Sequence, residues 1–381
     1  MANILVTGGA GFIGSNFVHH ILDTYSDYRV VNYDKLTYAG NLNNLSRITI
    51  DGQKNARYSF VQGDICDVPL LHETIEKHNI THIINFAAET HVDRSIHGDC
   101  TEFVMANTFG VLHILNSVKK YDIEKFVNVS TDEVYGSLAL DDDTFFTEET
   151  PIEPNMPYAA AKAGGDLLCR AYCAVHKLPV VVTHCSNNYG PYQYPEKLIP
   201  ISLFRLLKNK KITIHGNGQN VRDWIHVKDH CAALDLMLHK GKAGEIYNVG
   251  VDNERSNLDI AKMILSLMDK SENMIEFVAD RPANDLRYAI DASKIERLGW
   301  KPKYTKEKFD IGLSETINWY LTNKDWVEDL WAKHEEAHAI NHTPERIQKT
   351  KKQAAKTKTK VDKDERPTIN NTICYNSGNI K

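Results

Sequence analysis

The sequence predicts an α/β protein built on a doubly wound parallel sheet, with a smaller mixed α/β lobe. Short apolar runs alternate with helical patterns through the first half of the chain, and a glycine-rich turn follows the first run. Repeated strand-helix alternation of this kind is typical of a parallel sheet with helices on both faces. The chain has 381 residues, which at about 150 residues per domain allows roughly two domains.

Six buried strands are expected before residue 186, each an apolar run bounded by polar or glycine residues. They fall at 3–7, 29–33, 58–62, 82–86, 125–130 and 179–185, with helices near 67–78, 99–121 and 158–176. We expect residues 1–186 to form the cofactor domain, with some later segments returning to it. Residues 187–325 form mainly the substrate lobe, with helices near 198–208, 227–240 and 256–269. Residues 340–381 form a flexible tail rich in lysine.

The turn after the first strand carries glycines at the spacing of a dinucleotide site. Gly8, Gly11 and Gly14 allow a tight turn, close approach of backbone to a pyrophosphate, and close packing of helix on strand. The helix that begins at Phe12 and Ile13 then directs its amino end toward the phosphates. The sheet is therefore predicted to be of the Rossmann type.

The second strand leads to Asp34, twenty residues after Gly14. A carboxylate at this spacing suits the adenosine ribose and repels a ribose phosphate, which favours NAD over NADP, although Lys35 weakens the preference. Further cofactor contacts are expected where strands end. These candidates are Leu36, Thr37, Asp64, Ile65, Ala87, Ala88 and Asn188.

Two chemical groups follow the later strands. Tyr158 and Lys162 share one helix face, so the ammonium can hold a cofactor ribose and lower the pKa of the phenol, which then acts as a base. The adjacent Asp132 and Glu133 can take different protonation states, one as an acid and one as a base. Alone, a Tyr/Lys spacing is often accidental and paired acids usually form a solvated turn. Together with the glycine turn they indicate removal of water from a substrate.

Composition gives few signs of other partners. A formal charge of -5 gives no reason to expect nucleic acid or an anionic membrane, and no apolar run is long enough to span a bilayer. Because Met1 leads directly into a strand, we expect no secretory signal and a cytoplasmic protein. The seven cysteines lack paired zinc spacing, so they are interpreted as reduced thiols and no metal is expected.

Polar and basic residues in the later half are candidates for a phosphorylated sugar substrate, since arginine forks and amides suit diphosphate oxygens and hydroxyls. Candidates of this kind are Asn187, Asn188, Lys197, Arg222, Arg287 and Tyr288, and the family resemblance described below adds Thr90, Thr131, Leu198, Thr213, His215, Asn257 and Asn284 as expected substrate-binding residues.

Over about residues 2–320 the chain closely resembles the nucleoside-diphosphate-glucose 4,6-dehydratases of the extended short-chain dehydrogenase/reductase family. The resemblance rests on ordered motifs, of which Asp132-Glu133 is the most discriminating, because related 4-epimerases usually carry small or neutral residues there. These motifs are 7–14, 34–42, 63–65, 91–95, 131–133, 158–162, 187–191, 195–200, 221–224 and 285–291.

The resemblance implies a mechanism in which NAD is reduced and reoxidised within each turnover. Tyr158 takes the proton of the glucose 4-hydroxyl, Thr131 bonds that oxygen, and Lys162 supports Tyr158 and the ribose. Glu133 then removes the C5 proton while Asp132 protonates the departing 6-hydroxyl. The product is a 4-keto-6-deoxy sugar nucleotide of the rhamnose type. The resemblance also implies a homodimer that pairs through the helices near 99–121 and 158–176.

The substrate nucleotide is less firmly predicted. Thr90, His215 and Asn284 look like the choices of eukaryotic relatives that use UDP-glucose, whereas most other motifs are of the bacterial kind, which favours dTDP-glucose. One methyl group separates the two bases and is worth only about 1 to 3 kcal/mol in an apolar pocket. UDP-glucose therefore stays as the alternative. A sugar-nucleotide 4-epimerase and a catalytically silent NAD-binding protein are the remaining rivals.

Overall fold

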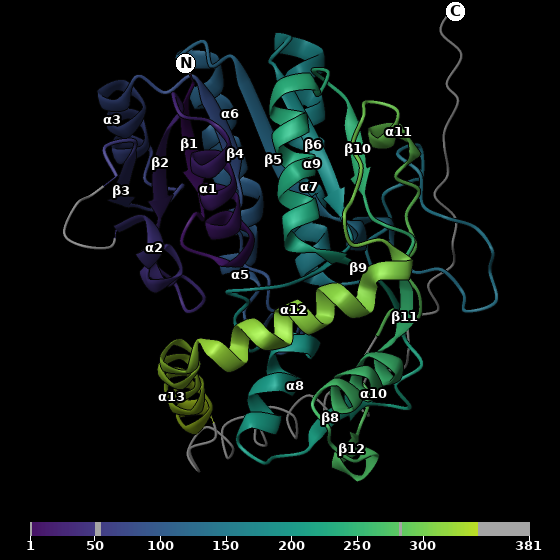
Figure 1. Cartoon of the computed structure of the whole chain (residues 1–381). Helices are drawn as coiled ribbons and strands as arrows, with labels where there is room; N and C mark the ends of the chain where they lie inside the picture. Colours follow the sequence, from purple (N-terminus) through teal and green to yellow (C-terminus); the bar gives the residue numbers. More distant parts are fainter. Residues whose placement is uncertain (1, 50–54, 282–283, 342–381) are drawn as a thin grey trace, which may run out of the picture. The chain divides into compact units, whose positions relative to one another are not determined.

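Seven parallel strands form the main sheet of the structure, a computed structural model that describes residues 2–49, 55–281 and 284–341. The strand order is β10-β6-β5-β4-β1-β2-β3, so the winding reverses between β1 and β4 (Figure 1). The strands span Asn3–Thr7 (β1), Arg29–Asp34 (β2), Tyr58–Gln62 (β3), His82–Asn85 (β4), Lys125–Thr131 (β5), Val180–Cys185 (β6) and Ile246–Val249 (β10). Open α/β sheets bind ligands outside the carboxyl ends of the strands at such a reversal.

Helices cover both faces of this sheet, which explains why its strands are almost continuously apolar. One face packs against α1 (Phe12–Thr24) and α9 (Val227–Lys240), and the other against α3 (Val68–His78), α6 (Val111–Lys120) and α7 (Pro157–His176). The strand β10 comes from the later half of the chain and pairs with β6. The predicted doubly wound parallel sheet is confirmed.

The predicted helix near 99–121 differs from expectation. The structure has α5 (Thr101–Val104), a π-helical segment η3 (Met105–Gly110) and then α6. Within η3, Asn107 bonds both backbone groups of Glu89, and Gly110 lies so close to Ile65 that a Cβ would be 2.2 Å from its Cδ1. Single π-turns of this kind are frequent near functional sites. Hydrophobic periodicity in the sequence does not reveal the additional residue that a π-helical turn inserts into an α-helix.

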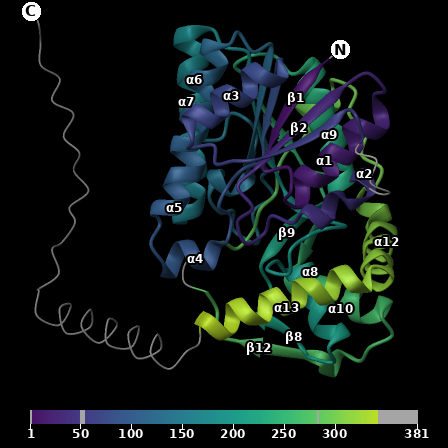
Figure 2. The same ribbon diagram turned by 90° about the vertical axis from the view of Figure 1, so that its left-hand side faces the viewer.

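Smaller sheets and helices lie beyond the carboxyl ends of the main strands, as the two views show (Figures 1 and 2). One sheet joins β7 (Asn187–Tyr189), β9 (Val221–His226) and β11 (Glu254–Ser256), and the other pairs β8 (Ile212–His215) with β12 (Ile275–Val278). The remaining elements are α2 (Ser46–Thr49), α4 (Val92–His97), α8 (Leu198–Leu207), α10 (Asn257–Leu267), α11 (Ser293–Glu296), α12 (Phe309–Thr322) and α13 (Lys324–Asn341), with 3-10 turns η1 (Leu42–Leu45), η4 (Asp132–Tyr135), η5 (Glu272–Met274) and η6 (Lys306–Lys308). The predicted boundary at residue 186 stays a prediction.

By its contacts the chain divides into two units, Met1–Glu328 and Asp329–Lys381. In the second unit, Asp329 and Lys333 form an ion pair of 2.7 Å one helical turn apart. From residue 342 onward the predicted lysine-rich tail lies outside the described residues. Within the described ranges, no helix is long and apolar enough to cross a membrane.

Candidate active site

The glycine turn after β1 leaves no room for side chains. Gly8 has a φ of +69°, and a Cβ there would be 2.6 Å from the backbone nitrogen of Ala87. A Cβ on Gly14 would be 2.3 Å from the carbonyl oxygen of Gly8. Gly11 caps the amino end of α1 without a side-chain bond, and Phe12 and Ile13 are the first residues of that helix. This bare turn at a helix amino end fits the pyrophosphate of the predicted NAD.

Asp34 ends β2 with a buried carboxylate. Its oxygens accept bonds from the backbone nitrogens of Ala10 (2.9 Å) and Leu36 (2.7 Å), and Leu36 is held at a φ of +58°. The carbonyl of Thr37 accepts a bond from Gly40 in the same turn. The carboxylate is thereby fixed beside the glycine turn, where the sequence places the adenosine ribose.

Lys35 turns away from this carboxylate and pairs with Asp64 at 2.8 Å. Burial raises the pKa of the Asp64 carboxyl, but the bond and charge of Lys35 and the bonds from Cys66 together outweigh it, so the net pKa lies below the ordinary value. The side chain of Ile65 is buried in the core, packed with η3, so only its backbone is left for the cofactor contact expected there.

The acid pair follows the end of β5. Thr131 caps η4 by accepting a bond from the backbone nitrogen of Glu133 at 3.3 Å. Asp132 is 2% exposed, and its Oδ2 has no hydrogen-bond partner among the described residues. Burial raises the pKa of Asp132 well above its usual range, and the charges of Glu133 and Asp223 add to the effect. A protonated carboxyl with one free oxygen is suited to donate a proton.

Glu133 has different neighbours. Burial raises the pKa of its carboxyl, while the cations Lys197 and Arg222 oppose that shift. The two consecutive acids are therefore held in unequal electrostatic environments, which is the arrangement that assigns one as acid and the other as base.

Tyr158 and Lys162 lie one turn apart on α7, both buried. Lys162 Nζ donates to the Val129 carbonyl at 2.6 Å, and burial lowers the pKa of its ammonium group. The pKa of Tyr158 is raised well above its usual range, by burial first and then by Glu133. The predicted lowering of the Tyr158 pKa toward working pH is therefore wrong, because spacing on a helix cannot reveal the desolvation of the phenol.

Several predicted substrate residues come together around Glu133. Lys197 Nζ donates to the Thr90 carbonyl at 2.9 Å, and Arg222 lies 4.1 Å above the ring of Tyr288. The pKa of Tyr288 is raised by burial and then by Glu133, which places this ring at the acid pair. In β7, Asn187 has a buried Oδ1 without a partner among the described residues. Lys197 and Arg222 give the site two cations, which suit an anionic ligand.

Arg287 is not brought to this cluster. It is 6% exposed, and it donates to both carboxylate oxygens of Glu254 and to the carbonyls of Asp142 and Thr144. The bonded guanidinium ties β11 to the segment after η4. Its predicted substrate contact is therefore not supported by the structure, because its donors already have protein partners.

The other predicted residues have local partners. Asn188 bonds His230 (2.8 Å) and the Ser186 carbonyl (2.9 Å). Thr213 and His215 lie on β8, where they bond Glu276 and the Ala279 carbonyl, and Asn284 bonds Asp280. Leu198 and Asn257 begin α8 and α10. Ala87 lies against the glycine turn and Ala88 follows it in the same loop. The roles of these residues stay predictions.

Three residues without a predicted role face the acid pair. Asp223 is buried with a pKa raised to about 6, Arg281 faces Glu133 while paired with Asp93 at 2.9 Å, and Cys185 lies beside Tyr158. Asp223 directly follows Arg222 and Cys185 lies two residues before Asn187, both of which were predicted to bind substrate, but only the fold shows that Asp223 and Cys185 converge.

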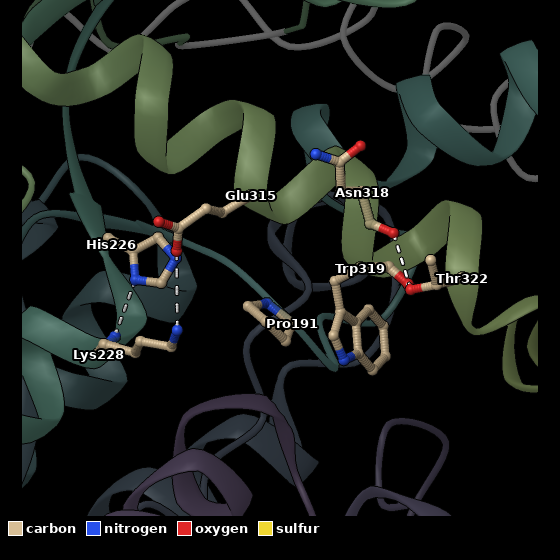
Figure 3. A pocket seen from close by; sticks show the side chains of 7 residues that line it. All are labelled: Pro191, His226, Lys228, Glu315, Asn318, Trp319 and Thr322. Carbon is tan, nitrogen blue, oxygen red and sulfur yellow. Dashed lines mark hydrogen bonds and ion pairs between the residues drawn. The ribbon is translucent and has the colours of Figure 1, made fainter.

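Figure 3 shows a different place, an open pocket of about 350 Å³. Its lining contains neither the acid pair nor the Tyr158/Lys162 pair, and the side chains of Lys228 and Glu315 lie 3.8 Å apart across it. The lining residues are Pro191, His226, Lys228, Glu315, Asn318, Trp319 and Thr322. In the described part of the chain, no cluster of three or more His, Cys, Asp or Glu residues is arranged to hold a metal ion.

The fold and the site define a class, the dinucleotide-binding enzymes that combine a Tyr/Lys pair with an acid pair. The pattern of the family described as GDP-mannose 4,6 dehydratase matches residues 5–316. A dTDP-glucose 4,6-dehydratase from Xanthomonas campestris is 46% identical over 349 residues, which cover 87% of this chain and 96% of that protein. The chain therefore belongs to the GDP-mannose 4,6 dehydratase family, and the predicted relationship to 4,6-dehydratases is confirmed.

Solved structures agree. A dTDP-glucose 4,6-dehydratase from Bacillus anthracis in complex with NAD is 48% identical, with a TM-score of 0.79, covering 87% of this chain and 100% of that one. A UDP-glucose 4-epimerase from Thermotoga maritima is 27% identical, with a TM-score of 0.75, covering 84% and 99%. Since both activities occur on this fold, the residues of the site must separate them.

Proposed function

We propose that this chain is an NAD-dependent hydro-lyase that converts dTDP-glucose into dTDP-4-keto-6-deoxyglucose. The observation that carries the proposal is the pair formed by the buried Asp132 and the partly buried Glu133, which lie beside Tyr158 in unequal environments. An epimerase has to oxidise and reduce C4 only, whereas dehydration also needs an acid at the 6-hydroxyl and a base at C5. The close dehydratase relatives support the same choice.

NAD, when bound along the glycine turn, supplies an acceptor and later a donor of hydride. Gly8, Gly11 and Gly14 make room for its pyrophosphate, and Asp34 holds the adenosine ribose. Lys162 holds the second ribose beside Tyr158. The bound oxidised nicotinamide is cationic, and a positive charge beside Tyr158 lowers the phenol pKa that burial has raised.

The residues of this chain then act in sequence on the sugar. Tyr158 takes the 4-hydroxyl proton while Thr131 donates a hydrogen bond to that oxygen. Once C4 is a ketone, the C5 proton becomes acidic and Glu133 removes it. Asp132 gives its proton to the 6-hydroxyl, which leaves as water and leaves a double bond between C5 and C6. C6 then takes back the hydride that C4 gave up, and the proton held by Glu133 returns to C5. Lys197 and Arg222 balance the negative charge that gathers at Glu133 and on the diphosphate.

The nucleotide is tested directly by incubating the purified chain with dTDP-glucose and, separately, UDP-glucose, with no added reductant. We expect a product lighter by one water, with the alkali-induced absorbance of a 4-keto sugar, from dTDP-glucose. Turnover of UDP-glucose alone would instead favour the alternative nucleotide, and a galactose isomer would favour an epimerase.

We further propose a homodimer formed through α7 and η3, two packed elements that carry exposed apolar side chains. Met105, Phe109 and Leu167 are 41%, 46% and 50% exposed, and apolar groups that gather on a surface mark interfaces. Sedimentation of the wild-type chain and of Phe109→Glu tests this, with a dimer expected for the first and a monomer for the second.

A cytoplasmic location is proposed as well, since the six cysteines in the described ranges are free thiols. Cell fractionation tests this location.

A further inference from the structure

A third polar residue occupies the same face of α7 as Tyr158 and Lys162. Asp166 lies one turn after Lys162 and is 3% exposed. Its Oδ1 accepts from Asn128 Nδ2 at 3.0 Å, and its Oδ2 accepts from Ser130 Oγ at 2.6 Å. His184 Nε2 lies 3.3 Å from the same Oδ2. This carboxylate is fully bonded and has no part in the mechanism described above.

The bonds of Asp166 and Lys162 meet on one strand. Asn128 and Ser130 flank Val129 in β5, and Val129 is the residue whose carbonyl accepts the bond from Lys162 at 2.6 Å. Two side chains of α7 thus hold three consecutive residues of β5, immediately before Thr131 and the acid pair. A small shift of Asp166 would move the lysine and the end of the strand together.

The charge of Asp166 also affects the ammonium group of Lys162. Lys162 is buried, which lowers the pKa of its ammonium, and Asp166 is the strongest group that opposes the shift, ahead of Cys185 and Cys169. The other titratable groups near this face are Tyr158 on α7 and His184 on β6, and the ring of His184 bonds the hydroxyl of Tyr135 at 2.7 Å. Asp132 and Glu133 lie beside Tyr158, and Asp166 is the acid that acts most strongly on Lys162.

We propose that Asp166 is a positioning residue whose buried carboxylate keeps Lys162 charged and holds it against the Val129 carbonyl, ready for the cofactor ribose. The inference rests on the proposed function only in taking Lys162 as the group that binds NAD. Binding of NAD needs no sugar, so a chain that binds NAD normally but fails to dehydrate dTDP-glucose would overturn the proposed function and leave this inference standing.

The experiment is a calorimetric titration of NAD into the NAD-free full chain between about pH 6 and about pH 9, a range below the ordinary pKa of lysine. Asp166→Asn keeps the shape and removes the charge. We expect it to bind NAD like the wild type at the acid end and to lose affinity from a lower pH, about tenfold for each pH unit once the ammonium deprotonates. The wild type should show no such fall in this range.

Two variants separate charge from packing. Ser130→Ala removes one hydrogen bond to Asp166 but keeps its charge, so its pH profile should follow the wild type. Asp166→Glu restores the charge and should restore the profile. A profile of Asp166→Asn that parallels the wild type, with only a lower melting temperature, would overturn the inference.

If Asp166→Asn does not fold, a measurement on the wild type can still overturn the inference. The ζ-¹⁵N resonance of Lys162, assigned by comparison with Lys162→Arg, should report an ammonium group throughout the same pH range. A neutral amine near neutral pH would show that Asp166 does not keep the lysine charged.

Discussion

Asp132 and Glu133 are consecutive residues whose carboxyl groups face opposite charges. The strongest charged neighbours of Asp132 are Glu133 and Asp223, which raise its pKa, whereas those of Glu133 are Lys197 and Arg222, which lower it. Burial raises both values, so the charged neighbours decide which acid keeps its proton. This difference supports our proposal that Asp132 acts as the acid and Glu133 as the base.

Replacing each of the two acids should therefore block a different step of the reaction. We expect Glu133→Gln to lose exchange of the C5 hydrogen with deuterated solvent, and Asp132→Asn to keep exchange while losing water slowly. Each should reduce kcat by about 10²- to 10⁴-fold, as for loss of a general acid or base. Proton NMR of the sugar in D₂O checks both, and identical exchange in the two variants would contradict the assignment.

Cofactor choice should depend on Asp34 rather than Lys35. Asp34→Ala removes the carboxylate that we propose binds the adenosine ribose, and the loss of a charged hydrogen bond of about 1.5 to 3 kcal/mol should weaken NAD binding by about 10- to 150-fold. NADP should lose much less, because the repulsion of its phosphate is relieved. Lys35→Ala is the matched control, since Lys35 is paired with Asp64. Competition binding of NAD and NADP measures the ratio.

Arg287 should contribute to stability. Its side chain is 8% exposed and is bonded to Glu254, so Arg287→Ala leaves a carboxylate without its partner, at a cost of about 3 to 5 kcal/mol. Lys262→Ala, which breaks an exposed pair with Glu272, should cost at most about 1 kcal/mol. Urea unfolding compares them. An unchanged free energy of unfolding with a raised KM would restore the substrate role that the sequence predicts.

Acidification should destabilise the chain partly through His230, whose burial lowers its pKa from 6.5 to about 3. The unfolded state then binds the extra proton between these values, so stability falls as pH falls below 6.5. Asp223, with its pKa raised to about 6, acts in the opposite direction and offsets part of the loss.

Replacing the histidine isolates its share. Between pH 7 and pH 5, His230→Gln should lose about 2 kcal/mol less stability than the wild type. His97→Gln, at an exposed position, is the control and should lose as much as the wild type. Urea unfolding at both pH values makes the comparison, and equal losses for His230→Gln and the wild type would count against a buried neutral His230.

The main sheet could be predicted because its strands can be recognised from the local sequence pattern. Strands such as β1 and β6 are buried on both faces, so they are mostly apolar runs. The glycines after β1 stand where a Cβ would collide with neighbouring backbone, so their spacing marks a tight turn. Tyr158 and Lys162 were found for a similar reason, since one helical turn brings them together whatever the rest of the fold does.

What escaped prediction depends on contacts distant in sequence. The charge of Asp223 raises the pKa of Asp132, which lies 91 positions earlier in the chain. Glu254, on another element, forms the ion pair with Arg287. The raised pKa of Tyr158 depends on burial, which spacing on a helix does not describe. Arginine is a reasonable candidate for binding diphosphate in any sequence, but a carboxylate elsewhere in the chain can bind its guanidinium group instead.

The central claim is that hydride moves within one sugar, from C4 to C6, while water leaves. It is tested most directly by giving the chain dTDP-glucose deuterated at C4 and locating the label in the product. Our account predicts a 4-keto-6-deoxy sugar with deuterium in the C6 methyl group. A product that keeps the label at C4, or a dehydrated product without it, would contradict the account.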